Sequence, residues 1–474
     1  MRLSRIGVRL LAFLAGATPA LGQVSATPEA PKRFDLAAID AYVGGVVRQK
    51  GLVGLSLAIV RDGQVVMAKG YGLRSLEDRQ PVEPTTTFAV GSVTKQFACA
   101  AILLLAEDGK LSVDDKVAKF FPDLTRAGEI TLRQLMNHTS GYPDYYPLDF
   151  VDRRLAKPVA VDAILREYAG GKLDFEPGSR WSYSNTGYLL LGRVVEKAAG
   201  KPFGEFVRER ILKPVGMEHA AVDPPRGEPS QARGYLPFTL GPAEPALPEA
   251  DGWLYAAGGL WATASDVARW DVALMGGKVL NPESMKAMTT PTTLTDGRVQ
   301  DYGFGLNVKR ESGRLVLSHG GAISGFRATN LLIPASKSAV VVLINDEQPD
   351  PGIAPAIVAL MLKADAPEDL IPKVVGPPPA EAARAFFDQL QSGKLDRSTL
   401  GEEFSAYLTA SRVEGASARL KPLGTPTKVE SLGVSERGGM EVASIRLSFP
   451  STSLKGLLYR SPDGKVQQLL FTKE

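Results

Sequence analysis

Three short motifs contain side chains that together could carry out acyl transfer. Ser92-Val93-Thr94-Lys95 is the only Ser-x-x-Lys of the chain, and the apolar pattern predicts a helix over residues 92–108. On a helix, a spacing of three puts both side chains on one face. The helix N-terminus supplies unpaired backbone N–H groups beside a developing oxyanion, and a partly buried lysine has a lowered pKa. The motif predicts a serine nucleophile with a lysine as its base.

A lone Ser-x-x-Lys is weak evidence, because chance supplies roughly one or two such matches in a chain of this composition. In isolation, the better explanation is a helix-capping Ser92 and a solvent-facing Lys95. However, Tyr183-Ser184-Asn185 is the only Tyr-x-Asn and His319-Gly320-Gly321 the only His-x-Gly. A helix cap and a strand-end turn explain each of these separately, but the joint occurrence of all three motifs favours a single catalytic site.

The elements that must position these residues follow from the apolar pattern. Strands are expected at 52–60, 64–72, 314–318, 326–334 and 338–345, and Thr263–Asp266 resembles a capping box before a helix. The helical patterns lie mostly between the two groups of strands. We therefore predict an α/β (α+β) fold with one antiparallel sheet of about five strands, flanked by helices and an all-helical lobe.

The C-terminal part is expected to be separate. Residues 363–380 contain five prolines and predict a stiff, exposed linker after a larger domain at 35–362. Beyond it, residues 381–474 combine a helical segment with alternating strand patterns, which indicates a small accessory α+β domain. No motif in it suggests chemistry.

The N-terminus has the pattern of an export signal. Arg2, Arg5 and Arg9 lead into the apolar stretch 10–17, and small residues stand at 20 and 22, so we expect a signal peptide at 1–22 cleaved after Gly22. The mature protein would then be periplasmic or secreted. The formal charge of +3 falls to zero without the three arginines. A neutral chain, 44% hydrophobic and 23% charged, is expected to be globular, with no nucleic-acid partner and no integral membrane segment. Its oligomeric state stays open.

The remaining chemically active residues give weaker signals. The three histidines are scattered and Cys99 is the single cysteine, so neither a metal site nor an organic cofactor is expected. His138 is interpreted as structural, with a hydrogen bond to a neighbouring loop, and Cys99 as a small core residue. The aromatic segment 142–150 either lines a cleft or packs as a loop.

Together, Ser92-x-x-Lys95, Tyr183-x-Asn185 and His319-Gly-Gly321 resemble the motifs of the serine β-lactamases and penicillin-binding proteins. The closest similarity is to the branch related to class C β-lactamases, which includes DD-peptidases, D-aminopeptidases and family VIII carboxylesterases. The resemblance covers about residues 35–360. Three further stretches support it, namely residues 135–141, 176–178 and 258–263.

The resemblance implies a role for each motif residue. Ser92 would be the acylated nucleophile, Lys95 its base, and Tyr183 the relay that carries a proton to the leaving group. Asn185 would bind a substrate amide or order Lys95. The backbone N–H groups of Ser92 and Ala322 would form the oxyanion hole, next to His319 and Gly321.

One departure from the family pattern bears on the substrate. Members that process penicillin usually have Lys-Thr-Gly where this chain has His319-Gly320-Gly321. A histidine is mostly neutral at pH 7 and donates one hydrogen bond, so it is a poorer partner for a substrate carboxylate. Arg327 is either a replacement cation or part of an ordinary salt bridge.

Two hypotheses follow. The first is an exported serine hydrolase that forms an acyl-enzyme on Ser92 and acts on esters, D-amino-acid amides or β-lactam-type substrates, with esters and amides favoured. The alternative is a non-catalytic module on the same scaffold that binds cell-wall peptide or a protein partner. The intact Ser, Lys, Tyr and Asn favour the enzyme.

Overall fold

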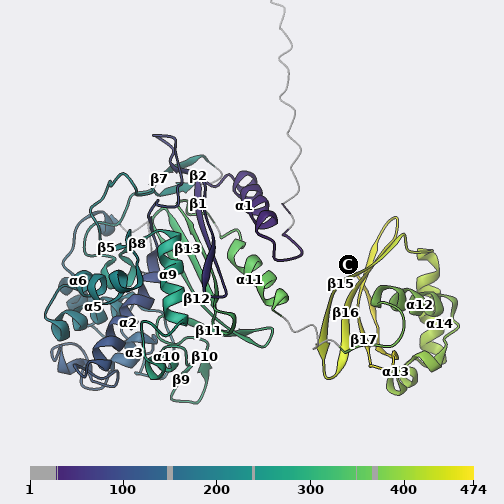
Figure 1. Ribbon diagram of the computed structural model, residues 1–474. Coiled ribbons are helices and arrows are strands. Elements are labelled where there is room, and N and C mark those ends of the chain that lie inside the picture. The colour runs from purple at the N-terminus through teal and green to yellow at the C-terminus, as the bar shows by residue number, and fades with distance from the viewer. Residues whose placement is uncertain (1–27, 29, 147–152, 238–240, 349, 366–371) are drawn as a thin grey trace, which may run out of the picture. The chain divides into compact units, whose positions relative to one another are not determined.

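The chain folds into two compact units, residues 1–364 and 365–474, in the computed structural model (Figure 1). The structure describes residue 28 and residues 30–146, 153–237, 241–348, 350–365 and 372–474. The expected signal peptide at 1–22 lies outside these residues. The last helix of the first unit is α11 (Ile353–Ala364), and the first helix of the second unit is α12 (Pro379–Ser392).

A seven-stranded antiparallel sheet forms the centre of the first unit, in the order β11-β12-β13-β14-β1-β2-β3. Its five inner strands are those that the sequence predicts. The two edge strands were missed, because they are short and polar. The strands are β1 (Gly54–Arg61), β2 (Gln64–Ser75), β3 (Gln80–Pro81), β11 (Asn307–Glu311), β12 (Arg314–Ile323), β13 (Phe326–Ile333) and β14 (Ser338–Ile344).

Each face of the sheet buries a separate core. On one face, α1 (Leu36–Lys50) lies beside β2 and α11 lies beside β14 and β13, and their apolar side chains share a core with those of β1 and β14. On the other face, α9 (Ala264–Met275) lies against β14, β1 and β2, and joins the sheet to the helical lobe (Figure 1). The Thr263–Asp266 capping box starts α9 as predicted. Because β1 and β14 are buried on both faces, their sequences are continuous apolar runs.

The helical lobe surrounds α2 (Thr94–Glu107), in which every residue from Thr94 to Leu105 is buried. Its other helices are α3 (Leu132–Met136), α4 (Val161–Tyr168), α5 (Asn185–Ala199), α6 (Phe203–Val207), α7 (Lys213–Val215), α8 (Tyr255–Gly258) and α10 (Pro282–Met288). A small three-stranded sheet and two strand pairs complete the unit. The sheet has the order β4 (Phe88–Ala89), β8 (Leu260–Ala262), β5 (Ala221–Val222), and the pairs are β6 (Tyr235–Pro237) with β7 (Ala243–Pro245) and β9 (Thr292–Thr293) with β10 (Val299–Gln300).

The second unit is an α+β domain with its own apolar core. One face of a five-stranded sheet packs on α12 and on α14 (Ala410–Leu420), with α13 (Glu402–Tyr407) beside them. Its strands are β15 (Lys428–Arg437), β16 (Met440–Ser448), β17 (Ser453–Arg460), β18 (Val466–Gln468) and β19 (Phe471–Lys473). Arg460 and Glu441 form a buried ion pair, and the Arg460 guanidinium also donates to the carbonyl of Pro377.

None of the helices in the described part of the chain has the length and hydropathy needed to cross a bilayer.

Candidate active site

Ser92 lies on a single 3₁₀ turn, Gly91–Val93, that leads directly into α2. The sequence places Ser92 at the first position of the α-helix, whereas the α-helix begins at Thr94. Gly91 starts the turn with φ 52°, a left-handed conformation that favours glycine. The Thr94 hydroxyl donates to the Gly91 carbonyl at 2.6 Å and holds the turn closed. The turn presents Ser92 to a cavity while Lys95 points into the protein.

Lys95 is fully buried and makes three hydrogen bonds. Its Nζ lies 3.0 Å from Ser92 Oγ, 2.7 Å from Asn185 Oδ1 and 2.7 Å from the carbonyl oxygen of Ala257. Burial lowers the pKa of Lys95 to about 7, since the protein interior solvates the ammonium less well than water does. Near neutral pH, a large fraction of Lys95 is therefore an uncharged amine.

The three partners determine what the neutral amine can do. A carbonyl and an amide oxygen only accept hydrogen bonds, so they take the two N–H groups of the amine. The remaining lone pair of Lys95 then faces Ser92 Oγ, which is the only one of the three partners that has a proton to give. This is the geometry of a general base poised to deprotonate a hydroxyl.

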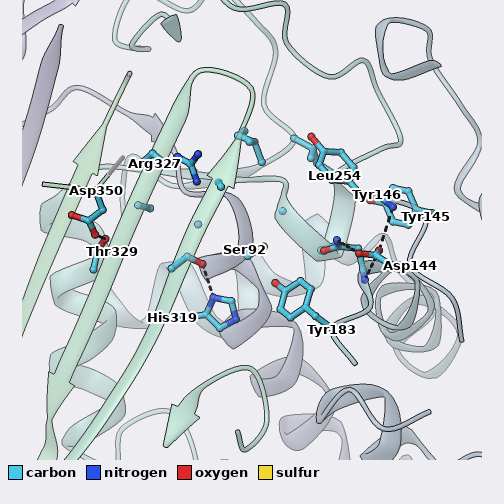
Figure 2. Close-up of a pocket in the computed structure, with 18 residues that line it drawn as sticks. Ser92, Asp144, Tyr145, Tyr146, Tyr183, Leu254, His319, Arg327, Thr329 and Asp350 are labelled. Carbon is cyan, nitrogen blue, oxygen red and sulfur yellow. Dashed lines mark hydrogen bonds between the residues drawn. The ribbon is translucent and has the colours of Figure 1, made fainter. Parts of the chain in front are cut away.

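The Tyr183 side chain lines the same cavity as Ser92 and lies close to it (Figure 2). Burial raises the pKa of Tyr183, whereas the neighbouring Ser92 hydroxyl acts to lower it, so the phenol stays protonated at neutral pH. The hydroxyl is buried and has no well-formed hydrogen bond among the described residues. Its proton is therefore available to a group bound beside Ser92. The Lys95 Nζ lies 4.8 Å from the centre of the Tyr183 ring.

His319-Gly320-Gly321 lies inside β12, not at a strand end as expected, because β12 continues to Ile323. β11 pairs with β12 only as far as Ser318, so the next residues have a strand neighbour on one side only. The turn that bears Ser92 packs on that free side. A side chain at Gly321 would collide with the carbonyl of Val90, and glycine therefore allows the close approach. Ala322 comes to line the same cavity as Ser92.

The imidazole of His319 is held by neighbours on both sides. Its Nδ1 lies 2.6 Å from the Gly320 carbonyl and its Nε2 lies 2.9 Å from the Tyr302 hydroxyl. Tyr302 also lies 3.3 Å from Nε2 of His138, whose Nδ1 accepts from the backbone N–H of Ser184 at 3.1 Å. These four contacts join the Tyr183 loop to β12.

Only one assignment of donors and acceptors satisfies every hydrogen bond between Ser184 and Gly320. Because the Ser184 N–H donates to Nδ1 of His138, the proton of His138 is on Nε2 and goes to Tyr302. Tyr302 then donates to Nε2 of His319, whose Nδ1–H donates to Gly320. Burial lowers the pKa of His319 to about 4 and that of His138 well below its usual value, so both rings stay neutral. His319 consequently has no free N–H for a substrate, contrary to the expectation from the sequence.

A cavity of about 490 Å³ opens in front of Ser92. It contains the sequence-predicted residues Ser92, Tyr183, Asn185, His319, Gly321 and Ala322. Lys95 lies behind it, bonded to Ser92. Tyr145 and Tyr146 line the opposite wall, so the described part of the segment 142–150 does face the cleft (Figure 2). The structure therefore brings all seven predicted residues to one place.

Three charged side chains line this cavity, namely Asp144, Arg327 and Asp350. Arg327 lies on β13, and its Nη2 is 3.8 Å from Oε1 of Glu347. It is thus both a cavity residue and a member of a long ion pair. Asp350 accepts from Thr329 Oγ1 at 2.8 Å, at the rim. The cavity carries more acidic than basic groups at its surface.

Sequence reasoning missed Asp144 and Tyr302. Both act through neighbours that are far away in sequence, and no spacing rule connects Asp144 with Asn185 or Tyr302 with His319. His138 was interpreted as structural with a bond to a loop, and it does accept from Ser184, but its ring also packs against that of Tyr183 at a tilt of 33°, with ring centres 4.3 Å apart. Cys99 is fully buried, and burial raises its pKa to about 12, as suits an inert core residue.

The described residues contain no group of three or more His, Cys, Asp or Glu side chains arranged to hold a metal ion.

The chain is similar in sequence to one protein family and to several known relatives. Residues 39–363 match the Beta-lactamase family. Penicillin-binding protein 4* of Bacillus subtilis is 31% identical over 306 residues, which is 60% of this chain and 66% of the relative. A D-aminopeptidase of Gluconobacter oxydans is 30% identical over 295 residues, 62% of this chain and 55% of the relative. The match thus spans less than two thirds of either relative.

One solved structure covers both units. The octameric penicillin-binding protein homologue from Pyrococcus abyssi superposes with a TM-score of 0.62, over 93% of this chain and 96% of the other, at 22% identity. At this identity the likeness shows the fold alone. A known protein therefore shares the fold over nearly the whole length of this chain.

Proposed function

This chain belongs to the Beta-lactamase family, a family of serine hydrolases, and from that premise we propose that it hydrolyses esters or D-amino-acid amides through an acyl-enzyme on Ser92. The observation that carries the proposal is the contact of Lys95 Nζ with Ser92 Oγ at 3.0 Å, with the other two Lys95 bonds made to oxygens that only accept.

Acylation begins when the neutral amine of Lys95 takes the Ser92 proton as Oγ attacks the substrate carbonyl. The new C–O bond forms while the carbonyl electron pair moves to oxygen. The backbone N–H groups of Ser92 and Ala322 stabilise that oxyanion, a contribution typically worth about 10²–10³ in rate per donor. Electrostatic help of this kind is strong here because the surrounding groups are buried.

Collapse of the intermediate expels the alcohol or amine, which takes a proton delivered by Tyr183. Tyr183 regains a proton from the ammonium of Lys95, so that the proton first taken from Ser92 ends on the leaving group. In deacylation, a water molecule gives one proton to Lys95 and adds to the acyl carbon. The acid is released as Ser92 regains a proton, and the site returns to its starting state.

Two observations favour esters and amides over β-lactams. His319 is neutral and has no free N–H, so it provides neither the charge nor the donor that a substrate carboxylate needs. Arg327 is the only cation at the cavity surface among the described residues, and its Nη2 lies 3.8 Å from the carboxylate of Glu347. The relative from Gluconobacter oxydans, a D-aminopeptidase, is consistent with an amide substrate.

We also propose that the protein is exported. Support comes from the sequence alone, through the arginines and the apolar stretch before Gly22.

Covalent labelling tests the proposal. A fluorophosphonate probe should add one adduct to the wild-type protein, on the peptide that contains Ser92, as seen by intact mass and peptide mapping. Ser92→Ala should show neither the adduct nor turnover of p-nitrophenyl butyrate and D-alanine p-nitroanilide. Labelling at another residue, or undiminished turnover by Ser92→Ala, would exclude Ser92 as the nucleophile. Absence of any adduct and of any turnover in the wild type would favour a binding module.

A further inference from the structure

We propose that Asp144 is a positioning residue of this site, which orients the side-chain amide of Asn185 and supplies the counter-charge for the buried Lys95 ammonium. The inference rests on the proposed function, because it concerns how Lys95 is kept ready to act as a base.

The Asp144 carboxylate binds Asn185 through two contacts. Oδ1 accepts from the backbone N–H of Asn185 at 3.0 Å, and Oδ2 accepts from Asn185 Nδ2 at 3.2 Å. Oδ1 also accepts from the backbone N–H of Tyr146 at 3.3 Å. Asn185 is the first residue of α5, a helix of 15 residues, so Asp144 stands at a helix N-terminus where a negative charge is favoured. These donors keep the carboxylate ionised although burial raises its pKa.

These contacts determine the orientation of the Asn185 amide. An ionised carboxylate only accepts hydrogen bonds, so the NH₂ group of the amide must face Asp144. The amide oxygen must then face Lys95, where it lies 2.7 Å from Nζ. In the reversed orientation, the amide oxygen would face the carboxylate and its N–H groups would face those of Lys95. Asp144 thereby ensures that Asn185 takes an N–H from Lys95 and leaves the amine lone pair directed at Ser92.

The groups that face Lys95 come from every element around it. They are Ser92 in the turn before α2, Cys99 on α2, Asn185 and Tyr188 on α5, the Ala257 carbonyl on α8, His319 on β12, His138 after α3, and Tyr183 and Asp144 in loops. Burial keeps Cys99 and the two tyrosines protonated and neutral, and keeps both histidines neutral.

Asp144 is therefore the one ionised carboxylate that acts on Lys95 among the residues the structure describes. Burial lowers the pKa of Lys95, and the charge of Asp144 partly offsets that effect. The amine consequently keeps enough affinity for protons to be an effective base close to neutral pH.

The substitution Asp144→Asn tests both effects, since it removes the charge at almost constant shape. The acidic limb of the kcat/KM profile for p-nitrophenyl butyrate should move to lower pH by roughly one unit, because an opposite charge nearby is lost. The plateau should fall by about ten- to a hundredfold, because the new amide lets Asn185 reverse. An acidic limb at the wild-type pH would overturn the proposal.

Two further variants separate the effect of the Asp144 charge from a general structural effect on α5. Asp144→Glu retains the charge in a shifted position, so its acidic limb should stay within about 0.3 unit of the wild type while its plateau falls. Asp162→Asn removes a carboxylate that pairs with Arg193, further along the same α5. It should destabilise α5 without moving the limb. A shift of equal size in Asp162→Asn would reduce Asp144 to a structural role.

A direct titration makes the test independent of turnover. In protein labelled with ¹³C at lysine Cε, Lys95 should be the lysine that titrates near pH 7, and its signal should vanish in Lys95→Met. The midpoint should fall in Asp144→Asn. If the wild type shows no Ser92 adduct but this midpoint moves, the proposed function fails and the Asp144 inference stands. If the adduct forms and the midpoint stays, only the Asp144 inference fails.

Discussion

The carbonyl oxygen of Val90 and the α-carbon of Gly321 approach each other so closely that a β-carbon on Gly321 would lie 2.0 Å from that oxygen. Real β-carbons do not come this near to an oxygen, so any side chain at 321 must push β12 away from the turn that bears Ser92. The contact explains why the second glycine after His319 is required, whereas the first is not. At Gly320, the only atom that a β-carbon would meet within 4 Å is the Ala328 carbonyl oxygen, at 3.7 Å.

Gly321→Ala should therefore lower kcat by about 10²–10³, because the Ala322 N–H moves away from the oxyanion. Gly320→Ala should cost at least tenfold less. Steady-state kinetics on p-nitrophenyl butyrate compare the two variants, with Tm measured for both. Equal losses would mean that strand conformation, and not the contact with Val90, limits activity.

The rate should rise with pH through the pKa of Lys95. Below this pKa of about 7 the ammonium has no lone pair, so kcat/KM should climb tenfold per pH unit and level off above it. Lys95→Met should lose about 10²–10⁴ in rate and lack this limb. A pH series in constant ionic strength gives both results. A wild-type profile that is flat from pH 5 to 8 would argue against a neutral lysine base.

Stability should respond to the same group. The pKa of Lys95 is about 7 when folded and 10.5 in a free lysine, so the unfolded state binds more protons between these values. The wild type should consequently gain stability relative to Lys95→Met as the pH rises from about 7 to 10.5, with the largest deficit below pH 7. Urea unfolding of both proteins at pH 6, 8 and 10 measures the trend. A difference that does not vary with pH would contradict the burial of the ammonium.

Tyr302→Phe should remove the hydroxyl whose two hydrogen bonds join His138 to His319. Two buried ring nitrogens lose their partner, and each unsatisfied group costs about 1–3 kcal/mol. The Tm should drop by several degrees, and kcat should fall as β12 and the Tyr183 loop lose their link. Tyr168→Phe is a suitable control because it removes an exposed bond to Arg154 and should change the free energy of unfolding by less than about 0.5 kcal/mol. Equal effects of the two substitutions would show that these buried hydrogen bonds contribute no more to stability than an exposed one does.

The second unit depends on the pair Arg460–Glu441, whose side chains are 3% and 9% exposed. Arg460→Met leaves a buried carboxylate without its partner and should destabilise this unit by about 3–5 kcal/mol. Combination with Glu441→Leu should recover most of the loss. Differential scanning calorimetry resolves the transition of this unit from that of the first. A single substitution without effect would indicate that water replaces the guanidinium.

The sequence predicted the five inner strands, α2, the α9 cap and the seven residues that meet at Ser92, because each depends on local periodicity or on a motif. It missed the continuation of β12 through Gly320 and Gly321, since glycines favour turns and only the contact with Val90 explains them in a strand. The short polar edge strands β3 and β11 have no apolar alternation. Asp144 and Tyr302 were missed for a similar reason, because only the folded chain brings them beside Asn185 and His319.

The pairing of β1 with β14 has a consequence for how the protein is made. Leu55 pairs with Ile344, so the centre of the large sheet closes a loop of nearly 300 residues. The first hairpin has no partner while a nascent chain is still short, and pairing over such a distance is slow. A chain released before β14 should remain open and sensitive to proteases. The centre of the sheet therefore closes only after most of the first unit has been synthesised.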